Sequence, residues 1–258
     1  MRINHDINGG SGKAGPSLFI CSPSYSGDFN CHFVTSLLQT TRILEEKKIP
    51  YTIYFSVYDS LVARSRNDLV DNFLKTDCTH ILMIDADQGW TPGSVPKMLS
   101  LDKDCLTGAV ISRKPNAEEY AIKIGTNEDM TPLVNEQGLI RCSSNGVAFA
   151  MIKSCVFEKI KWANWYNQSV YPYFQHFYGK DGSHYGEDTY FINEWNKIGE
   201  TWIYPDITFK HGTNEGNYHE FLLKQPQPGI ELTYLEKVIN SLNYNLNNLD
   251  YNLNKGLT

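Results

Sequence analysis

The sequence has no stretch of about 18 consecutive apolar residues, the length that a membrane-spanning helix requires. It also has no CxxC pair and no cysteine–histidine spacing typical of a zinc site. Residues 1–16 are polar and Gly-rich and lack the apolar segment of a signal peptide. Several of the six cysteines lie in apolar runs, which indicates reduced core thiols. We therefore predict a cytoplasmic protein without a membrane span.

An excess of basic residues is absent as well. The chain has 23 Lys and Arg against 29 Asp and Glu, a net charge of −6 and a pI near 5.6. This balance argues against a partner that is bound through its phosphate backbone, such as nucleic acid. A hydrophobic content of 41% over 258 residues is enough for one large α/β domain with a sizeable core.

The most informative segment is His80–Asp87, in which the apolar run Ile81–Ile84 ends in the carboxylates Asp85 and Asp87. A short apolar run bounded by turn residues predicts a strand that is buried on both faces. Ligands of open α/β sheets bind at the carboxyl ends of such strands. The two carboxylates are thus placed for hard-cation or phosphate chemistry. The alternative is that Asp85 only caps a turn and Asp87 is only solvated.

Strand and helix patterns alternate along the chain. The strands are predicted at residues 18–21, 51–58, 80–84, 105–112, 146–152 and 201–207, with small strands at 120–124 and 139–142. The helices are predicted at residues 33–47, 61–75, 93–99, 155–160 and 189–198. This alternation predicts an α/β fold with right-handed crossovers. We divide the chain into a flexible lead-in (1–16), one domain (17–228) and a C-terminal tail (229–258).

Arg66 is an anomaly in the predicted helix 61–75. At about 100° per residue it lies in the middle of the apolar face that Val62, Leu69, Val70 and Phe73 form. A guanidinium directed at a core is costly unless an anion meets it. The partner is either a carboxylate of the His80–Asp87 segment or a bound diphosphate. Both interpretations place Arg66 beside Asp85 or Asp87.

Residues 162–185 are rich in aromatics, including Trp162, Trp165 and Tyr185, without a clean period of 2 or 3.6. Such rings either form a platform for a flat apolar ligand face, as in a sugar, or pack the loop onto the body. Glu187 and Asp188 follow at the start of the next predicted helix. There they are either capping carboxylates or functional groups.

Two further features allow more than one interpretation from the residues alone. His211, after the strand at 201–207, is either an ordinary surface histidine or a ligand for a metal. Leucine and isoleucine recur with a heptad spacing between Leu235 and Leu253, in an Asn-rich sequence. This tail is either an amphipathic helix, which would allow a homo-oligomer through residues 232–253, or a disordered low-complexity segment.

Taken together, the segments resemble the GT-A glycosyltransferases of the large inverting group, especially compact viral and bacterial members. The resemblance covers about residues 17 to 220. Its segments follow one another in a fixed order: 59–67 (DSLVARSRN), 84–87 (IDAD), 146–153 (GVAFAMIK), 186–191 (GEDTYF) and 204–211 (YPDITFKH). The resemblance implies a Rossmann-like mixed, mainly parallel central sheet flanked by helices, with a C-terminal helical tail.

The resemblance also implies roles for individual residues. Asp85, Asp87 and His211 match metal ligands, and the oxygen-rich set suits Mn²⁺ or Mg²⁺. Asp188 matches the general base, with Glu187 beside it. The nucleotide sugar is assigned to Pro23, Ser24, Tyr25, Arg64, Arg66, Asn67, Asp85 and Lys114, and the acceptor to Trp162, Trp165 and Tyr185.

The implied activity is a hexosyltransferase-type reaction. A sugar moves from a nucleotide-diphosphate sugar to a hydroxyl of a glycan or similar acceptor, in the host cytoplasm if the chain is viral. Two alternatives remain, a sugar-phosphate nucleotidyltransferase and a non-catalytic sugar-binding protein. The first typically uses a basic Gly-rich loop after the first strand, and residues 22–27 contain no Lys or Arg.

Overall fold

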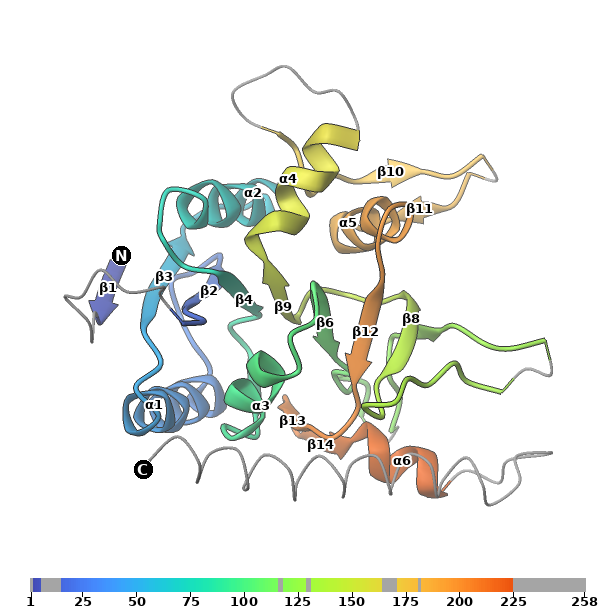
Figure 1. Ribbon diagram of the computed structural model, residues 1–258, viewed down its shortest axis with the longest axis horizontal. Coiled ribbons are helices and arrows are strands. Elements are labelled where there is room, and N and C mark those ends of the chain that lie inside the picture. Colours follow the sequence, from blue (N-terminus) through green and yellow to red (C-terminus); the bar gives the residue numbers. More distant parts are fainter. Residues whose placement is uncertain are drawn as a thin grey trace.

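The computed structural model describes residues 2–5, 15–115, 118–128, 131–163, 171–180 and 182–224, with backbone only for residues 2–5, 162 and 163. Within these residues the chain forms a central sheet with helices on both faces (Figure 1). The predicted mixed α/β class is therefore confirmed.

The central sheet of the described residues has nine strands in the order β1-β3-β2-β4-β9-β6-β12-β8-β7. Their bounds are β1 Arg2–His5, β2 Leu18–Ser24, β3 Tyr51–Val57, β4 His80–Ile84, β6 Cys105–Gly108, β7 Lys123–Ile124, β8 Ile140–Ser144, β9 Phe149–Lys153 and β12 Thr201–Tyr204. Strands β2, β3, β4, β6 and β12 run in one direction, and β9 runs against its neighbours β4 and β6.

Alternation along the central strands divides the core into two layers. In β2, Leu18 and Ile20 belong to one buried cluster, whereas Phe19 and Cys21 belong to the other. Successive side chains of a strand point to opposite faces of the sheet, so both faces must be covered by helices. This explains why Leu18–Cys21 of β2 and Ile81–Ile84 of β4 are uninterrupted apolar runs.

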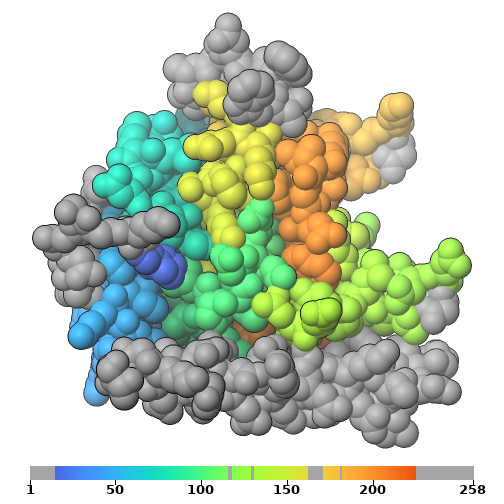
Figure 2. All heavy atoms as spheres, in the orientation of Figure 1, coloured from blue at the N-terminus to red at the C-terminus, as the bar shows by residue number. Residues whose placement is uncertain are grey.

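Six helices of the described residues surround the sheet: α1 Cys31–Glu46, α2 Val62–Phe73, α3 Ser94–Ser100, α4 Ser154–Ala163, α5 Glu187–Asn196 and α6 Tyr218–Lys224. Helices α1 and α3 contribute to one core cluster, and α2, α4 and α5 contribute to the other. Figure 2 shows the second group along the upper part of the molecule, from α2 in teal through α4 in yellow to α5 in orange. Helix α6 packs on residues of β8 and β12.

Two small sheets complete the described residues. Strand β13 (Thr208–His211) pairs on one side with β5 (Gln88–Trp90) and on the other with β14 (Asn214–Asn217). The hairpin β10 (Phe177–Tyr178) and β11 (His184–Tyr185) precedes α5. Strand β13 directly continues the strand predicted at residues 201–207. Strands β5, β10, β11 and β14 are not among the predicted strands, because two to four residues are too few to show the alternation of apolar and polar residues.

Two predicted segments flank the domain, the lead-in at residues 1–16 and the tail at residues 229–258. Arg2–His5 pair with β3 in antiparallel register, so four residues of the predicted flexible lead-in form an edge strand. Residues 229–258, with the heptad pattern, lie outside the described residues, and the predicted helical tail and oligomer contact stay predictions. In the described part of the chain, no helix is long and apolar enough to cross a membrane.

Candidate active site

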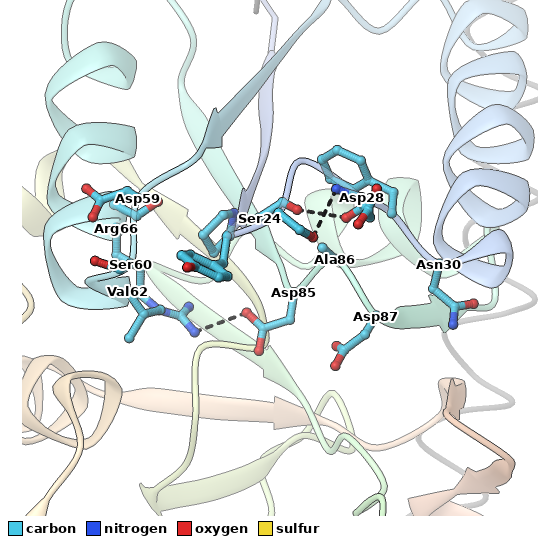
Figure 3. Close-up of a pocket in the computed structure, with 15 residues that line it drawn as sticks. Ser24, Asp28, Asn30, Asp59, Ser60, Val62, Arg66, Asp85, Ala86 and Asp87 are labelled. Carbon is cyan, nitrogen blue, oxygen red and sulfur yellow. Dashed lines mark hydrogen bonds and ion pairs between the residues drawn. The ribbon is translucent and has the colours of Figure 1, made fainter.

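A cavity of about 520 Å³ opens at the carboxyl ends of β2, β3 and β4 (Figure 3). This volume is within the range of small-molecule sites, and strand ends are where open α/β sheets bind ligands. The wall comes from the segments after these strands and from the first turns of α2: Pro23, Ser24, Tyr25, Ser26, Asp28, Phe29, Asn30, Asp59, Ser60, Val62, Ser65, Arg66, Asp85, Ala86 and Asp87.

The loop after β2 forms one side of this cavity. The Ser24 hydroxyl donates a hydrogen bond to the Asp28 carbonyl over 2.7 Å, and the Asn30 amide donates to the Ala86 carbonyl over 2.9 Å. Gly27 has φ 81°, and a Cβ there would lie 3.0 Å from the Tyr58 ring, so the turn requires glycine. The Tyr25 side chain is 72% exposed and offers a free aromatic face at the rim.

Arg66 of α2 connects the cavity with α5. Its Nη2 lies 3.0 Å from Asp85 Oδ1, and its Nε lies 3.1 Å from Glu187 Oε1. The side chain is only 5% exposed, and Nη1 approaches the Val147 carbonyl at 3.5 Å. The guanidinium on the apolar helix face is therefore met by two carboxylates, as buried charge requires. This confirms the predicted ion pair between Arg66 and the His80–Asp87 segment. We call Arg66, Asp85 and Glu187 the buried cluster.

Asp188 lies next to the buried cluster at the start of α5. Its Oδ1 accepts a hydrogen bond from the Thr189 amide over 2.6 Å, and a Cβ on Gly146 would lie 2.9 Å from its Oδ2. Burial raises the pKa of Asp188, and Glu187 and Asp85 raise it further, while Arg66 opposes the shift. A partly buried carboxylate with a raised pKa is a stronger base than an ordinary aspartate, which suits a group that accepts a proton in a reaction.

Asp87 belongs to a second, more open group. Its Oδ2 lies 3.0 Å from Arg113 Nη1 and 3.4 Å from His211 Nε2. The side chains of Asp87 and Arg113 are 37% and 67% exposed. The His211 imidazole and the Arg113 guanidinium hold the pKa of Asp87 below its usual range despite partial burial. We call Asp87, Arg113 and His211 the open cluster.

The His211 ring shows which of its nitrogens is available to a ligand. Its Nδ1 is 2.8 Å from the Ile111 carbonyl, which can only accept, so Nδ1 carries the proton. In the neutral ring, the buried Nε2 then turns a lone pair towards the Asp87 carboxylate without a hydrogen-bond partner. Two facing acceptors require a proton or a cation between them. Burial lowers the pKa of His211, but Asp87 and the Ile111 carbonyl together raise it above its ordinary value.

This arrangement fits a divalent cation at Asp87 and His211, because metal-binding imidazoles commonly donate their other N–H to a backbone carbonyl. The predicted set of three ligands, however, is not assembled. Asp85 is turned towards Arg66, whereas Asp87 points elsewhere (Figure 3). Among the described residues, no three His, Cys, Asp or Glu side chains converge to hold a metal. The candidate cation site is thus reduced to a pair.

Three predicted nucleotide residues have other partners. Asn67 forms hydrogen bonds of 2.8 and 3.0 Å with the backbone of Phe174, so it positions the segment before β10. Arg64 forms two hydrogen bonds of 2.7 Å with Asp59 and does not line the cavity. Lys114 pairs with Glu119 at 2.7 Å on the surface. Pro23, Ser24, Tyr25, Arg66 and Asp85 line the cavity, and their predicted role in nucleotide-sugar binding stays a prediction.

The aromatic segment before α5 divides into a buried and an exposed part. Tyr171, Tyr173 and Phe174 are buried against α4 and α5, which agrees with the packing interpretation for these residues. Tyr185 stacks on Phe177 with the ring centroids 4.7 Å apart. Trp165 lies outside the described residues, and Trp162 is described by its backbone only. The predicted acceptor role of these three residues stays a prediction.

Two residues of the site were not assigned from the sequence. Arg113 contacts Asp87, although its neighbour Lys114 was chosen as the basic ligand residue. Both follow the same predicted strand, and the sequence offers no signal to separate them. Asp59 lines the cavity at the end of β3 and accepts a hydrogen bond from the Leu61 amide over 2.9 Å. Its place after a strand, before a helix, was the available signal.

No protein-family model matches the chain, and no curated protein matches it. Solved structures do match. One is TarS of S. aureus, residues 1–349, in complex with UDP-GlcNAc, with a TM-score of 0.45 and 10% identity over 87% of this chain and 72% of that chain. Another is a glycosyltransferase involved in the glycosylation of the major capsid of PBCV-1, with a TM-score of 0.30 and 10% identity over 57% of this chain and 66% of that chain.

At these identities and TM-scores the matches establish neither the fold nor the function of this chain. The assignment of a function therefore depends on the geometry of the cavity and of the two clusters in this chain.

Proposed function

We propose that this protein is a glycosyltransferase that moves a hexosyl unit from a nucleotide-diphosphate sugar to a hydroxyl of a glycan or similar acceptor. One observation carries the proposal. A cavity at three strand ends is bordered by a free aromatic face, by the open cluster through Asp87 and by the buried cluster through Arg66 and Asp85. The raised pKa of Asp188 next to the buried cluster adds a base to this constellation.

The donor would lie along the wall from the β2 loop to the open cluster. Pro23 and Tyr25 offer apolar surfaces for the base, and the Asp59 carboxylate in the same wall offers hydrogen-bond acceptors. The diphosphate would lie near Asp87, where the exposed Arg113 guanidinium can pair with phosphate oxygens. The sugar would then lie on the side of Arg66 and Asp85, the part of the wall next to which Asp188 lies.

Asp188 is the proposed general base. The acceptor hydroxyl oxygen attacks the anomeric carbon, its proton moves to the Asp188 carboxylate, and the bond from the anomeric carbon to the diphosphate oxygen breaks. The electron pair of that bond leaves with the nucleoside diphosphate. A single displacement of this kind inverts the anomeric configuration. Arg66 and Glu187 hold the start of α5, and thus Asp188, in position.

Asp87 and His211 would hold Mn²⁺ or Mg²⁺, with donor phosphate oxygens and water completing the coordination. Bound there, the cation would supply positive charge that stabilises the leaving diphosphate. The chain contributes the tautomer of His211, which the Ile111 carbonyl fixes, and the deprotonated state of Asp87.

A panel of sugar nucleotides, incubated with and without Mn²⁺, tests the proposal. Wild-type protein should release a nucleoside diphosphate from at least one of them, and Asp188→Asn should lower that rate by about 10²–10⁴-fold, the usual contribution of a positioned base. Asp71→Asn, on the exposed face of α2, is the control and should keep wild-type activity.

Three outcomes would contradict the proposal. Binding of a sugar nucleotide by wild-type protein without turnover would identify a binding protein. Release of pyrophosphate from a nucleoside triphosphate and a sugar phosphate would identify nucleotidyl transfer. Equal rates for Asp188→Asn and wild type would remove the assigned base.

A further inference from the structure

A second cavity, of about 540 Å³, lies beside the cavity at the ends of β2, β3 and β4, which we call the donor cavity. Its wall comes from residues 60–67 at the start of α2 and from residues 172–176 before β10. Ser60 and Val62 line both cavities, so the two are separated by a single short segment of chain. None of the roles assigned above uses this second cavity.

Hydrogen bonds and ring stacking hold the wall of the second cavity together. The Asn67 side chain donates to the Phe174 carbonyl over 2.8 Å and accepts from the Phe174 amide over 3.0 Å. Phe174 is buried and stacks on Phe191 of α5 with centroids 4.9 Å apart. The segment 172–176 is therefore fixed to both α2 and α5.

The same wall is connected to the candidate catalytic groups. His176 lines the cavity, and its Nε2 lies 3.7 Å from Glu187 Oε2. Glu187 is the carboxylate that pairs with Arg66, and Asp188 follows it in the chain. An occupant of the second cavity would thus touch a side chain that contacts the buried cluster.

The chemistry of the second cavity suits a neutral sugar ring. Leu61 and Val62 are apolar but 56% and 37% exposed, and they offer a surface for the C–H face of a ring. Gln175 and His176 add hydrogen-bonding groups for hydroxyls. The Arg64 guanidinium at this site is already neutralised by Asp59 over two 2.7 Å hydrogen bonds, so an anionic ligand is not required.

We propose that the second cavity binds a neutral sugar unit of the acceptor glycan. The inference rests on the proposed function and extends it to the acceptor. The acceptor then approaches between α2 and the segment before β10, while the donor occupies the cavity at the strand ends.

The test uses the full chain, the sugar nucleotide that it hydrolyses, and a panel of p-nitrophenyl glycosides of glucose, galactose, mannose, N-acetylglucosamine, xylose and rhamnose. Leu61→Trp fills the second cavity without facing the donor cavity. It should lower kcat/KM for the glycoside by at least about tenfold, mainly through KM, as changes of pocket shape do. Hydrolysis of the donor by water should stay within about twofold of wild type.

Leu38→Trp is the matched control, because Leu38 is similarly exposed on α1, away from both cavities. Gln175→Ala is the second variant and should also raise the KM for the glycoside alone. Transfer unchanged in both variants, or donor hydrolysis without transfer to any glycoside, would overturn this inference and leave the proposed function standing. No donor hydrolysis by wild type would overturn the proposed function and this inference with it.

Discussion

The two ion clusters at the candidate site differ in solvent exposure. In the buried cluster, the Arg66 and Glu187 side chains are 5% and 9% exposed, and Arg66 makes two contacts of 3.0–3.1 Å with carboxylates. In the open cluster, Arg113 is 67% exposed and reaches Asp87 with one nitrogen. Buried pairs are costly to break, whereas exposed pairs contribute little to stability.

The difference in exposure indicates that the two clusters have different roles. The buried cluster joins α2, the end of β4 and the start of α5, which are far apart in the sequence, so it positions Asp188. The open cluster holds its charges where they can exchange partners. The Arg113 guanidinium, which is 67% exposed, can turn from Asp87 to a ligand at small cost, because water already competes for this contact. His211 is held by the Ile111 carbonyl and keeps its Nε2 directed at Asp87.

The largest expected effect is the loss of stability on breaking the buried cluster. Arg66→Met leaves Asp85 and the buried Glu187 without their cation and should lower the free energy of unfolding by about 3–5 kcal/mol. Arg113→Met, in the open cluster, should lower it by less than about 1 kcal/mol. Urea denaturation followed by tryptophan fluorescence measures both.

A further substitution separates lost charge pairing from lost packing. Adding Glu187→Gln to Arg66→Met removes one unpaired carboxylate and should recover part of the stability. If Arg66→Met and Arg113→Met destabilised the protein equally, the contrast between the clusters would be wrong.

A smaller effect is expected from moving Asp188 without changing any charge. In Gly146→Ala the new Cβ would lie 2.9 Å from Asp188 Oδ2, so the carboxylate must shift. Displacement of a reacting group by about 1 Å can cost about 10²-fold, and kcat should fall by up to that factor. Gly93→Ala is the control, because nothing lies within 4 Å of its Cβ. Equal kcat for the two variants would count against Asp188 as the base.

The smallest effect concerns pH. Burial favours the protonated form of Asp188, so its pKa is raised and the ionised base forms only at higher pH. The profile of kcat/KM should therefore rise with pH through a midpoint above the ordinary aspartate value of about 3.9. Circular dichroism at each pH checks that the fold is intact. A midpoint at or below the ordinary value would show that Asp188 is not the titrating group.

The sequence predicted the parts of the site in which burial and charge conflict. Arg66 on an apolar helix face required an anion, and the structure supplies Asp85. The run Ile81–Ile84 required a central strand, and β4 lies between β2 and β9. In both cases one unfavourable free-energy contribution, from an unpaired buried charge or from apolar side chains in water, left few possible arrangements of the chain.

Other parts depend on contacts that no local pattern reveals. Asp87 meets His211 because the three-residue strand β5 pairs with β13 in a register that aligns Gln88 with His211. Asp85 and Asp87 point apart because Asp85 pairs with Arg66. From the sequence alone, either carboxylate could be the partner of Arg66. Arg113 reaches Asp87, whereas the next residue, Lys114, pairs with Glu119 instead.

The donor site is tested most directly by calorimetric titration of nucleoside diphosphates, UDP among them, into wild type and Asp87→Asn with and without Mn²⁺. One diphosphate should bind to wild type, Mn²⁺ should tighten this binding by at least about tenfold, and Asp87→Asn should remove the Mn²⁺ effect. Asp71→Asn should behave as wild type. Absence of binding, or an Mn²⁺ effect that Asp87→Asn leaves unchanged, would contradict the assignment of this cavity to the donor.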